Sequence, residues 1–538
     1  MDRTWDAIVV GTGMGGAVIG FSLARAGKKV LFCEMGKSHL GIRDSLKGDY
    51  AEEFLSQSEA ADLPGEEVLA RTGRYRARIE DASSRRPFSF VPFIGSGTGG
   101  SSALYGMVME RFHPADFEPG RYHRQATGSS IPEQWPISYA EISPFYESAE
   151  KLFRVRGTPD PLRDDASMGN LLAPPPLSPG VEAIHDSLTG KNLHPYRPPV
   201  ACEFVSGCTY CQSYLCEKSC KNDSARICLE PAISRFGATL ASECEVERLE
   251  ATRSKVTGVF CRQNGDQLTL KGDIVVLAAG ALETPRILLN SSTPEWPNGL
   301  ANDSGLVGRN LMRHYIDLYA VASKIHGKSM SSIKEIAFND FYLHDSQKLG
   351  SVQSFGAMPP ASMLADGLVD DLRKGPLSLL AGPLALAKPL VKTVLHRIFR
   401  GRIVLASILE DLPYAGNRIT LPDSAGRSDE KRLVLHYQIS DYDRLRIEEF
   451  RREVAKALRP HSFMLIKQAD SNERIAHACG TCRFGSDPKE SVLDPQNRAH
   501  GISNLFVVDS SFFPTSGGTN PGLTIAANAL RVSDHLLN

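Results

Sequence analysis

A glycine-rich turn lies between a short apolar run and a helical pattern near the start of the sequence. The turn reads Gly-Thr-Gly-Met-Gly-Gly over residues 11–16, and a second apolar run after the helical pattern ends at Glu34. A strand, such a turn and a helix in this order predict a dinucleotide-binding βαβ unit. Gly11 allows the tight turn, Gly13 lets the backbone approach a pyrophosphate, and Gly16 lets helix and strand pack closely. We expect the Glu34 carboxylate to accept hydrogen bonds from ribose hydroxyls.

The composition narrows the class of protein. The chain has 538 residues, so we expect more than one structural region, and its formal net charge of −1 gives no electrostatic case for nucleic acid as a partner. The first predicted strand starts within the first ten residues, so no signal peptide is expected. No run approaches the ~20 apolar residues of a transmembrane helix. These features predict a cytoplasmic protein, with export on a signal-bearing partner subunit left open.

Two further segments have glycine turns of the kind that bring the backbone close to a ligand. Residues 93–112 carry four closely spaced glycines between apolar runs, which predicts a loop beside a bound molecule rather than a surface loop. Residues 273–290 read as a buried strand, a turn at Gly280 and a helix, which is a second unit of the βα type. Short alternating runs between residues 236 and 270 predict β-strands that lead into it.

The pattern of apolar residues changes over residues 315–470. It predicts a second domain that contains a sheet and interrupts the first. Alternating apolar residues run over 315–322, 402–409 and 433–439, and a helical pattern runs over 443–458. No motif in this region identifies a substrate.

One apolar stretch of this region, residues 375–400, could meet a membrane or a partner. Four basic residues stand four apart, which places them on one side of a helix: Lys388, Lys392, His396 and Arg400. The stretch predicts either an interfacial helix that faces a membrane surface or an electron-accepting partner, or a covered helix beside the substrate entrance. Pro383 and Pro389 favour the covered helix, because they break any long helix.

Sequence blocks along nearly the whole chain resemble the glucose–methanol–choline family of FAD oxidoreductases. Besides the first turn, the matching blocks are GTGGSSALYGM, VVLAAGALETPRILL, GLVGRNLMRH, HACGT, VVDSSFFP and TNPGLTIAANALRVSD, in the family's order. Three other blocks are most similar to the catalytic subunits of bacterial FAD-dependent glucose and gluconate dehydrogenases: WPISYAEISPFY, EWPNGLANDSGLVGRNL and EDLPYAGNRI.

The resemblance implies an α/β fold (α+β overall) with a discontinuous, Rossmann-like FAD-binding domain. The inserted substrate domain would be built on an antiparallel sheet flanked by helices. The FAD-binding parts would be residues 1–134, 201–314 and 471–538. The substrate-domain parts would be residues 135–200 and 315–470.

The resemblance also implies how the chain would hold FAD. The first glycine turn and Glu34 would bind the ADP half, the 99–101 loop would line the flavin ring, and the turn that begins at Asn520 would close on the other side of the ring. The full predicted set is Gly11, Gly13, Gly16, Glu34, Gly99, Gly100, Ser101, Val246, Ala279, Asp509, Pro521 and Thr524. Some family members attach the flavin through a histidine in the loop that corresponds to residues 99–106. This loop has none, so non-covalent FAD is expected.

His477 and Asn520 are the predicted catalytic residues. His477 precedes Thr481 in the family's H-x-x-G-T pattern, and Asn520 stands where the family carries His or Asn. A neutral imidazole can take the proton of an alcohol near pH 7, and a carboxamide can fix the orientation of the alcohol oxygen. His314 and His500 are expected to be structural.

A cysteine-rich segment, residues 202–228, could bind metal. Its spacing is C-x₂-C-x₄-C-x₃-C from Cys208 to Cys220, and soft thiolates in a tight loop suit zinc or an iron–sulfur cluster. Similar sugar dehydrogenases carry a three-iron cluster here, but their adjacent cysteine pair is absent and Lys221 replaces their proline. Three interpretations stay open: an iron–sulfur cluster, a structural metal or disulfide, or free buried thiols. The candidate ligands are Cys208, Cys211, Cys216 and Cys220.

These motifs predict FAD-dependent oxidation of an alcohol group in a sugar, cyclitol or related polyol. Hydride would pass to flavin N5, with His477 as the base and Asn520 orienting the substrate oxygen. Electrons would then pass to an external acceptor, either a protein or a quinone. One alternative is an oxidase that reduces O₂ to H₂O₂. Another is a flavin-holding interaction protein without turnover, which the intact His477–Asn520 pair speaks against.

Overall fold

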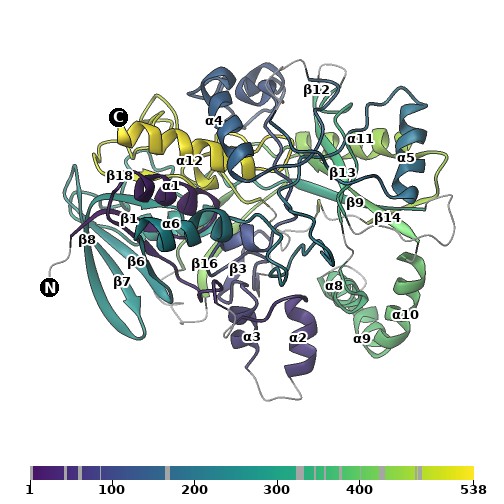
Figure 1. Ribbon diagram of the computed structural model, residues 1–538, viewed down its shortest axis with the longest axis horizontal. Helices are drawn as coiled ribbons and strands as arrows, with labels where there is room; N and C mark the ends of the chain where they lie inside the picture. Colours follow the sequence, from purple (N-terminus) through teal and green to yellow (C-terminus); the bar gives the residue numbers. More distant parts are fainter. Residues whose placement is uncertain are drawn as a thin grey trace.

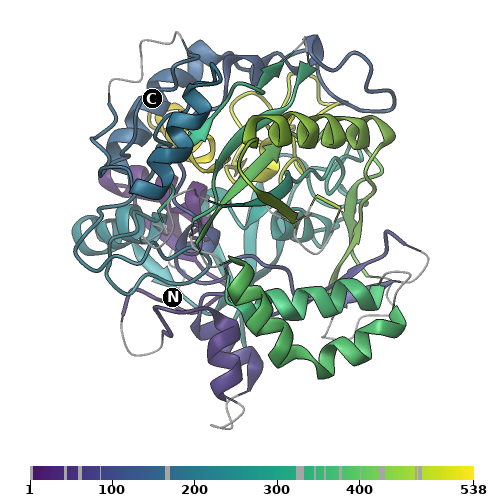
Figure 2. The same cartoon turned by 90° about the vertical axis from the view of Figure 1, so that its right-hand side faces the viewer.

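The computed structural model describes residues 4–41, 45–58, 64–84, 87–163, 170–322, 333–344, 347–356, 359–374, 378–399, 401–422, 431–466, 469–470, 475 and 477–538. A mixed, largely parallel sheet and an antiparallel sheet lie at opposite ends of the longest axis (Figure 1). Helices lie against the larger sheet (Figure 1) and against the antiparallel sheet (Figure 2). This mixed architecture confirms the predicted fold class.

The larger sheet has seven strands among the described residues. Its parallel part runs β5-β2-β1-β8, with β18 beside β8, and β8 continues into an antiparallel meander with β7 and β6. The strands are β1 (Thr4–Val10), β2 (Val30–Cys33), β5 (Thr239–Ala241), β6 (Cys244–Ala251), β7 (Val256–Gln263), β8 (Asp266–Leu277) and β18 (Leu505–Val507). The parallel strands are continuous apolar runs because both of their faces are buried.

Three helices stack on this sheet. α1 (Met14–Arg25) contacts α12 (Gly522–Leu537), which contacts α4 (Tyr139–Leu152), and Figure 1 shows α1 and α12 side by side. Gly16 lets α1 lie close against the turn that follows β1, because a Cβ there would lie 2.1 Å from the Gly11 carbonyl oxygen. Ser138 and Glu141 form a capping box that starts α4 at Tyr139, so Pro144 lies inside the helix and not in its first turn as its sequence context suggests. Two shorter helices are α6 (Glu230–Phe236) and α7 (Gly280–Leu289).

The second sheet has five antiparallel strands within the described residues, in the order β10-β13-β14-β9-β17. They are β9 (Tyr315–Ala322), β10 (Ala337–Phe338), β13 (Gly350–Ser354), β14 (Arg402–Leu409) and β17 (Phe463–Ile466). One face shares a core with α5 (Pro179–Thr189) and α11 (Asp441–Leu458), and the opposite face carries Leu318, Ala320, Val404 and Ala406. The strands predicted at 315–322 and 402–409 are therefore correct.

A third sheet joins segments that are far apart in the sequence. Its order is β15-β16-β3-β4, and the predicted strand at 433–439 is found in it as β16. The strands are β3 (Arg78–Asp81), β4 (Phe88–Phe90), β15 (Arg418–Thr420) and β16 (Lys431–His436), and a small hairpin is formed by β11 (Leu343–His344) and β12 (Gln347–Lys348). The remaining α-helices are α2 (Ala51–Ser58), α3 (Gly65–Arg71), α8 (Ala361–Lys374), α9 (Ala381–Leu386) and α10 (Lys388–Phe399). None of the helices in the described ranges is long and apolar enough to cross a membrane.

Candidate functional site

The first glycine turn leaves an open, donor-rich place at the start of α1. A Cβ added at Gly13 would meet no atom within 4 Å. The backbone N–H groups of residues 14–16 have no acceptor among the described residues, as is usual for the first turn of a helix. Free N–H groups and the helix dipole together favour an anion at this place.

The Glu34 carboxylate ties the loops around this place together. Its two oxygens accept hydrogen bonds from Thr12 N (3.1 Å), Thr12 Oγ1 (2.6 Å), Gly36 N (3.0 Å) and Gly97 N (2.9 Å). Burial raises the pKa of Glu34, and these hydrogen bonds act against that rise. Four donors occupy the acceptor sites of a carboxylate, so a contact with ribose requires one of them to give way and stays a prediction.

The second glycine loop lies directly on the first. A Cβ at Gly100 would be 3.1 Å from the Gly13 Cα, and the Gly99 N–H donates to Thr12 Oγ1 at 3.2 Å. Ser101 closes the loop, because its Oγ accepts from the Gly95 N–H at 3.0 Å. Two backbone segments predicted to touch one ligand are therefore adjacent in the fold.

Asp509 joins the end of β18 to the start of α7. Its Oδ2 accepts from the Gly280 N–H (2.9 Å) and from Thr284 Oγ1 (2.5 Å), while the Ala279 N–H donates to Thr284 Oγ1 at 3.2 Å. Burial raises the pKa of Asp509, and the hydrogen bonds oppose this rise. Asp509 and Ala279 thus fix the turn between β8 and α7, and their contact with FAD stays a prediction.

Two other predicted FAD residues also have structural partners. The Val246 carbonyl accepts from Arg286 Nη2 at 3.1 Å, and Thr524 Oγ1 hydrogen-bonds the Tyr146 hydroxyl at 2.8 Å. Pro521 immediately precedes α12, whose first turn points its N–H groups out of the helix. Any contact of Thr524 with a cofactor would therefore be made mainly by its backbone.

His477 lies next to a histidine to which sequence reasoning assigned no functional role. His477 Nδ1 is 2.7 Å from His314 Nδ1, and His314 Nε2 lies 3.1 Å from the Ser516 carbonyl oxygen and 2.9 Å from that of Gly517. Carbonyl oxygens only accept hydrogen bonds, so His314 Nε2 carries the hydrogen and its Nδ1 is the acceptor. His477 Nδ1 must then donate, which leaves its Nε2 with a lone pair.

Both rings are neutral at physiological pH. Burial lowers the pKa of His314 to about 4, although the two carbonyls act in the opposite direction. Burial also lowers the pKa of His477 well below its usual value, and the charges of His314 and Lys334 lower it further. A neutral His477 with a free Nε2 is the form that can accept a proton.

Asn520 is oriented by the second sheet. Gln353 on β13 donates from Nε2 to Asn520 Oδ1 at 2.6 Å, which leaves the Asn520 Nδ2 group as a donor. Val352 belongs to the core under α11, so strand alternation places Gln353 on the opposite face of the sheet. That face therefore looks toward the segment that carries Asn520.

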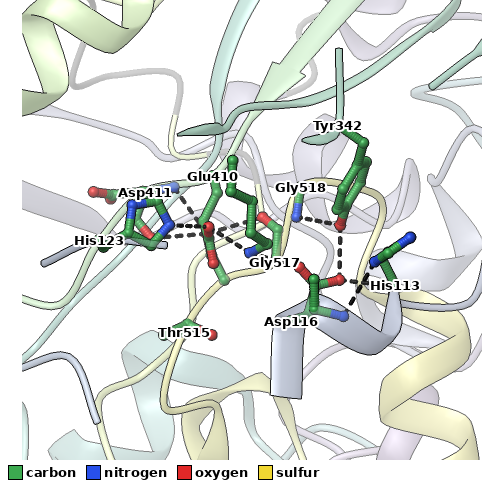
Figure 3. A network of polar contacts seen from close by, with 12 residues as sticks. His113, Asp116, His123, Tyr342, Glu410, Asp411, Thr515, Gly517 and Gly518 are labelled. Atoms are coloured by element: carbon green, nitrogen blue, oxygen red, sulfur yellow. Dashed lines mark hydrogen bonds and ion pairs between the residues drawn. The ribbon is translucent and has the colours of Figure 1, made fainter. Parts of the chain in front are cut away.

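A buried network of charges fixes the loop that holds His314 (Figure 3). The Tyr342 hydroxyl accepts from the Gly518 N–H at 2.8 Å and donates to Asp116 Oδ2 at 2.7 Å. Lys348 Nζ lies 2.6 Å from Asp116 Oδ1 and 2.5 Å from Glu410 Oε2. The residue after Glu410 binds the same loop, because the Asp411 N–H donates to Ser516 Oγ at 2.9 Å.

The cysteine segment brings its sulfur atoms together, including one that the predicted ligand set lacks. The Sγ atoms of Cys202, Cys208 and Cys220 lie within 4.8 Å of one another. Cys208 and Cys220 are 3.1 Å apart, and Cys216 is 3.6 Å from Cys220. None of the 11 cysteines forms a disulfide, so the disulfide interpretation is wrong. Cys202 was missed because five residues lie between it and the C-x₂-C motif, although it belongs to the same segment.

A surface formed by residues 378–399, called the α9–α10 surface below, exposes large apolar side chains. Leu379 is 92% exposed, Leu386 is 88% exposed and Leu390 is 67% exposed. The interpretation of this stretch as a covered helix is therefore wrong for these residues. The prediction that this stretch forms no single long helix is correct, because Ala387 separates α9 from α10. Residues 375–377 and Arg400, and the side chain of His396, lie outside what the structure describes.

Known proteins share this architecture and sequence. GMC oxidoreductase family models match residues 5–316 and residues 413–529. A 6'''-hydroxyparomomycin C oxidase of Streptomyces lividus is 30% identical, covering 99% of this chain and 91% of its own length. The gluconate 2-dehydrogenase flavoprotein of Pantoea cypripedii is 23% identical over 97% of this chain and 92% of its own. The structure of pyridoxine 4-oxidase from Mesorbium loti has the same fold, with a TM-score of 0.61 at 18% identity, over 99% of each chain.

These matches confirm the resemblance noted in the sequence blocks, including the similarity to sugar dehydrogenase subunits. The family model that matches residues 5–316 alone spans more than half of the chain. The protein therefore belongs to the GMC oxidoreductase family.

Proposed function

We propose that the protein oxidises an alcohol group of a sugar, cyclitol or related polyol to a carbonyl, with His477 as the base and Asn520 orienting the substrate oxygen. Electrons then pass to an external acceptor. The observation that carries this proposal is the hydrogen bond between His314 and His477, which leaves His477 Nε2 as a free acceptor. The division into FAD-binding and substrate-binding segments given above is part of the proposal.

The residues around the first turn suit a dinucleotide such as FAD. The α1 N-terminus, with its open space at Gly13, would take the pyrophosphate, and the adjacent Gly99–Gly100 backbone would take the flavin side. When bound, FAD would supply the hydride acceptor at N5. The 99–106 loop offers no histidine for a covalent bond, which supports non-covalent binding.

Hydrogen bonds fix the tautomer of both histidines, His314 first and His477 through it. The carbonyls of Ser516 and Gly517 accept a hydrogen bond from His314 Nε2, so the hydrogen of that ring is on Nε2. The unprotonated His314 Nδ1 then accepts a hydrogen bond from His477 Nδ1. His477 Nε2 can therefore take the hydroxyl proton of the substrate. The protonated ring keeps the same bond to His314, so it does not need to turn during proton transfer. General base catalysis of this kind contributes about 10²–10⁴ in rate.

Asn520 contributes orientation. Its Oδ1 is held by Gln353, so its amide group donates from Nδ2 to the substrate oxygen. Holding the reacting carbon beside the hydride acceptor lowers the entropic cost of bringing the two into the reactive orientation.

The converged cysteines support a metal centre as part of the proposal. The thiolates of Cys202, Cys208, Cys216 and Cys220 would hold an iron–sulfur cluster or a structural metal, with Cys211 beside them. A cluster would supply one-electron transfer toward an acceptor. Because 11 unpaired cysteines persist in a reducing compartment, they also support a cytoplasmic location.

The α9–α10 surface supports a peripheral contact with a membrane that holds the acceptor. Residues 378–399 contain no acidic residue, and Lys388, Lys392 and Arg397 accompany the exposed leucines. Apolar side chains beside cations bind the boundary of an anionic bilayer. A quinone dissolved in that bilayer would be the acceptor.

The proposed reaction predicts that a polyol bleaches the flavin. Purified protein is mixed without oxygen with a panel of sugars, cyclitols and polyols, and the fall in flavin absorbance is followed. At least one of them should bleach the flavin, and His477→Ala should slow this by about 10²–10⁴ because the base is lost. His500→Gln, a change in a histidine bonded to Ser491, should bleach at the normal rate. A panel that never bleaches the flavin refutes the activity. Peroxide formed in air at the rate of substrate oxidation identifies an oxidase.

The fixed tautomers predict that His314 supports catalysis because its Nδ1 accepts the hydrogen bond from His477 Nδ1. His314→Leu removes the acceptor for His477 Nδ1, so the rate constant of flavin reduction should fall by about 10²-fold, with little change in the substrate concentration that gives half the maximal rate. His314→Asn retains an acceptor oxygen and should stay within about ten-fold of the parent. Equal losses in both variants would show that His314 only fills space.

The cysteine cluster predicts bound metal. Anaerobically purified protein should contain iron or zinc by elemental analysis, and an iron–sulfur cluster should add absorbance beyond the flavin bands. Cys202→Ser and Cys220→Ser should lose the metal, because each removes a thiolate from the converged set. Cys228→Ser, at a buried thiol outside that set, should keep it. Protein with flavin bands alone and neither metal would eliminate the centre.

The α9–α10 surface predicts binding to anionic vesicles. The parent protein should sediment with vesicles that contain phosphatidylglycerol and much less with pure phosphatidylcholine. Leu390→Asp should weaken this binding by about ten-fold or more. It removes apolar area that the bilayer would bury, and its carboxylate is repelled by the anionic lipids. Leu445→Asp is the matched control, since Leu445 on α11 is also 67% exposed. If both variants bind like the parent, this surface does not meet the bilayer.

A further inference from the structure

Lys334 offers a hydrogen-bond donor and Gln212 a hydrogen-bond acceptor close to Gly106. A Cβ added at Gly106 would lie 2.6 Å from Lys334 Nζ and 2.8 Å from Gln212 Oε1. Gly106 ends the 99–106 loop, Gln212 lies in the cysteine segment, and Lys334 precedes β10. Three distant segments thus meet at Gly106, whose missing side chain lets both polar groups approach its backbone closely.

Both polar groups lack a partner in the described part of the chain. Gln212 is only 9% exposed, and its buried Oε1 accepts no hydrogen bond. Lys334 Nζ has no hydrogen bond to a described residue and lies 6.0 Å from the centre of the Phe355 ring. Burial lowers the pKa of Lys334 to about 8, so the ammonium form still predominates at neutral pH. Leaving a buried acceptor and a cation unpaired costs free energy, which a ligand could recover.

Lys334 lies near the proposed reaction site. The Lys334 charge is close enough to His477 to lower its pKa. Phe355, over which Lys334 lies, is two residues after Gln353, whose side chain holds Asn520. Gln353 Oε1 is itself buried and accepts no hydrogen bond from a described residue, so a further acceptor is available beside Asn520. Lys334 therefore relates Gly106 to the proposed catalytic pair.

We propose that Lys334 and Gln212 read one hydroxyl group of the substrate, at a position other than the carbon that is oxidised. Lys334 Nζ donates to the hydroxyl oxygen, and the hydroxyl hydrogen is donated to Gln212 Oε1. A hydroxyl is the group that accepts and donates at once, as this pair requires. The inference rests on the proposed function and makes Lys334 a specificity-determining residue for neutral polyols.

The same pair rejects groups of other charge. An ammonium at this position would be repelled by Lys334, and a carboxylate would leave Gln212 Oε1 facing another acceptor. An analogue without the hydroxyl would leave both protein groups unpaired, which is the arrangement that gives strong discrimination. The site should therefore prefer a polyol over its aminodeoxy and its carboxylate counterpart.

The test compares three ligands that differ at one end: D-glucitol, 1-amino-1-deoxy-D-glucitol and D-gluconate. Binding to the FAD-loaded protein is measured from the change in flavin absorbance without oxygen, and flavin reduction is measured separately. The parent should bind D-glucitol more tightly than either counterpart. Lys334→Met should weaken D-glucitol binding by about 10- to 100-fold and reduce the discrimination against the amine, because one charged hydrogen bond and one repulsion disappear. Gly106→Ala adds a methyl group that would push Lys334 Nζ and Gln212 Oε1 out of place, so it should weaken D-glucitol binding without removing the charge.

Lys489→Met, at an exposed lysine, is the control and should change neither binding nor preference. If D-glucitol binds with this preference but no polyol bleaches the flavin, the proposed reaction fails while the hydroxyl site stands. If Lys334→Met and Gly106→Ala leave the order and strength of binding unchanged, the hydroxyl site is refuted whatever the flavin does.

Discussion

The contact between two imidazole rings depends on a short loop that buried charges hold in place. The carbonyls of Ser516 and Gly517 can fix the hydrogen on His314 only if they stay aimed at its Nε2. Tyr342 and Asp411 bind the same loop from two sides, and behind them Lys348 is fully buried between Asp116 and Glu410. Removing one partner of such a buried pair typically costs about 3–5 kcal/mol, so the loop can hardly shift without breaking the network. A rigid loop thus sets the tautomer of His477 through His314.

The two halves of the molecule are joined at the reacting atoms. His477 and Asn520 belong to the C-terminal segment that completes the larger sheet and its helix layer, whereas Gln353, which holds Asn520, belongs to the antiparallel sheet. A movement of one sheet relative to the other would therefore change the direction of the Asn520 amide.

Local sequence patterns predicted the elements, and long-range contacts decided what they could not predict. The glycine turn at 11–16 and the strands at 315–322 and 402–409 were predictable because periodicity and glycine act within a few residues. The role of His314 was not, because 163 residues separate it from His477 and only the fold brings them together. Cys202 was missed for a similar reason, since it reaches the other thiols through the bend of its segment and not through motif spacing. Glu34 was correctly placed at the end of a strand, but its four internal donors could not be read from the sequence.

The strand order has a consequence for how the protein is made. On the ribosome, β1 emerges early, yet its neighbour β8 follows more than 250 residues later, and β18 must still add to β8 after that. Until then the newborn N-terminal unit exposes an apolar strand edge, which invites pairing with other chains. Synthesis therefore passes through a long interval in which this edge is open, and a chain halted before β18 would have an unfinished sheet and would lack Asn520, on which the proposed chemistry depends.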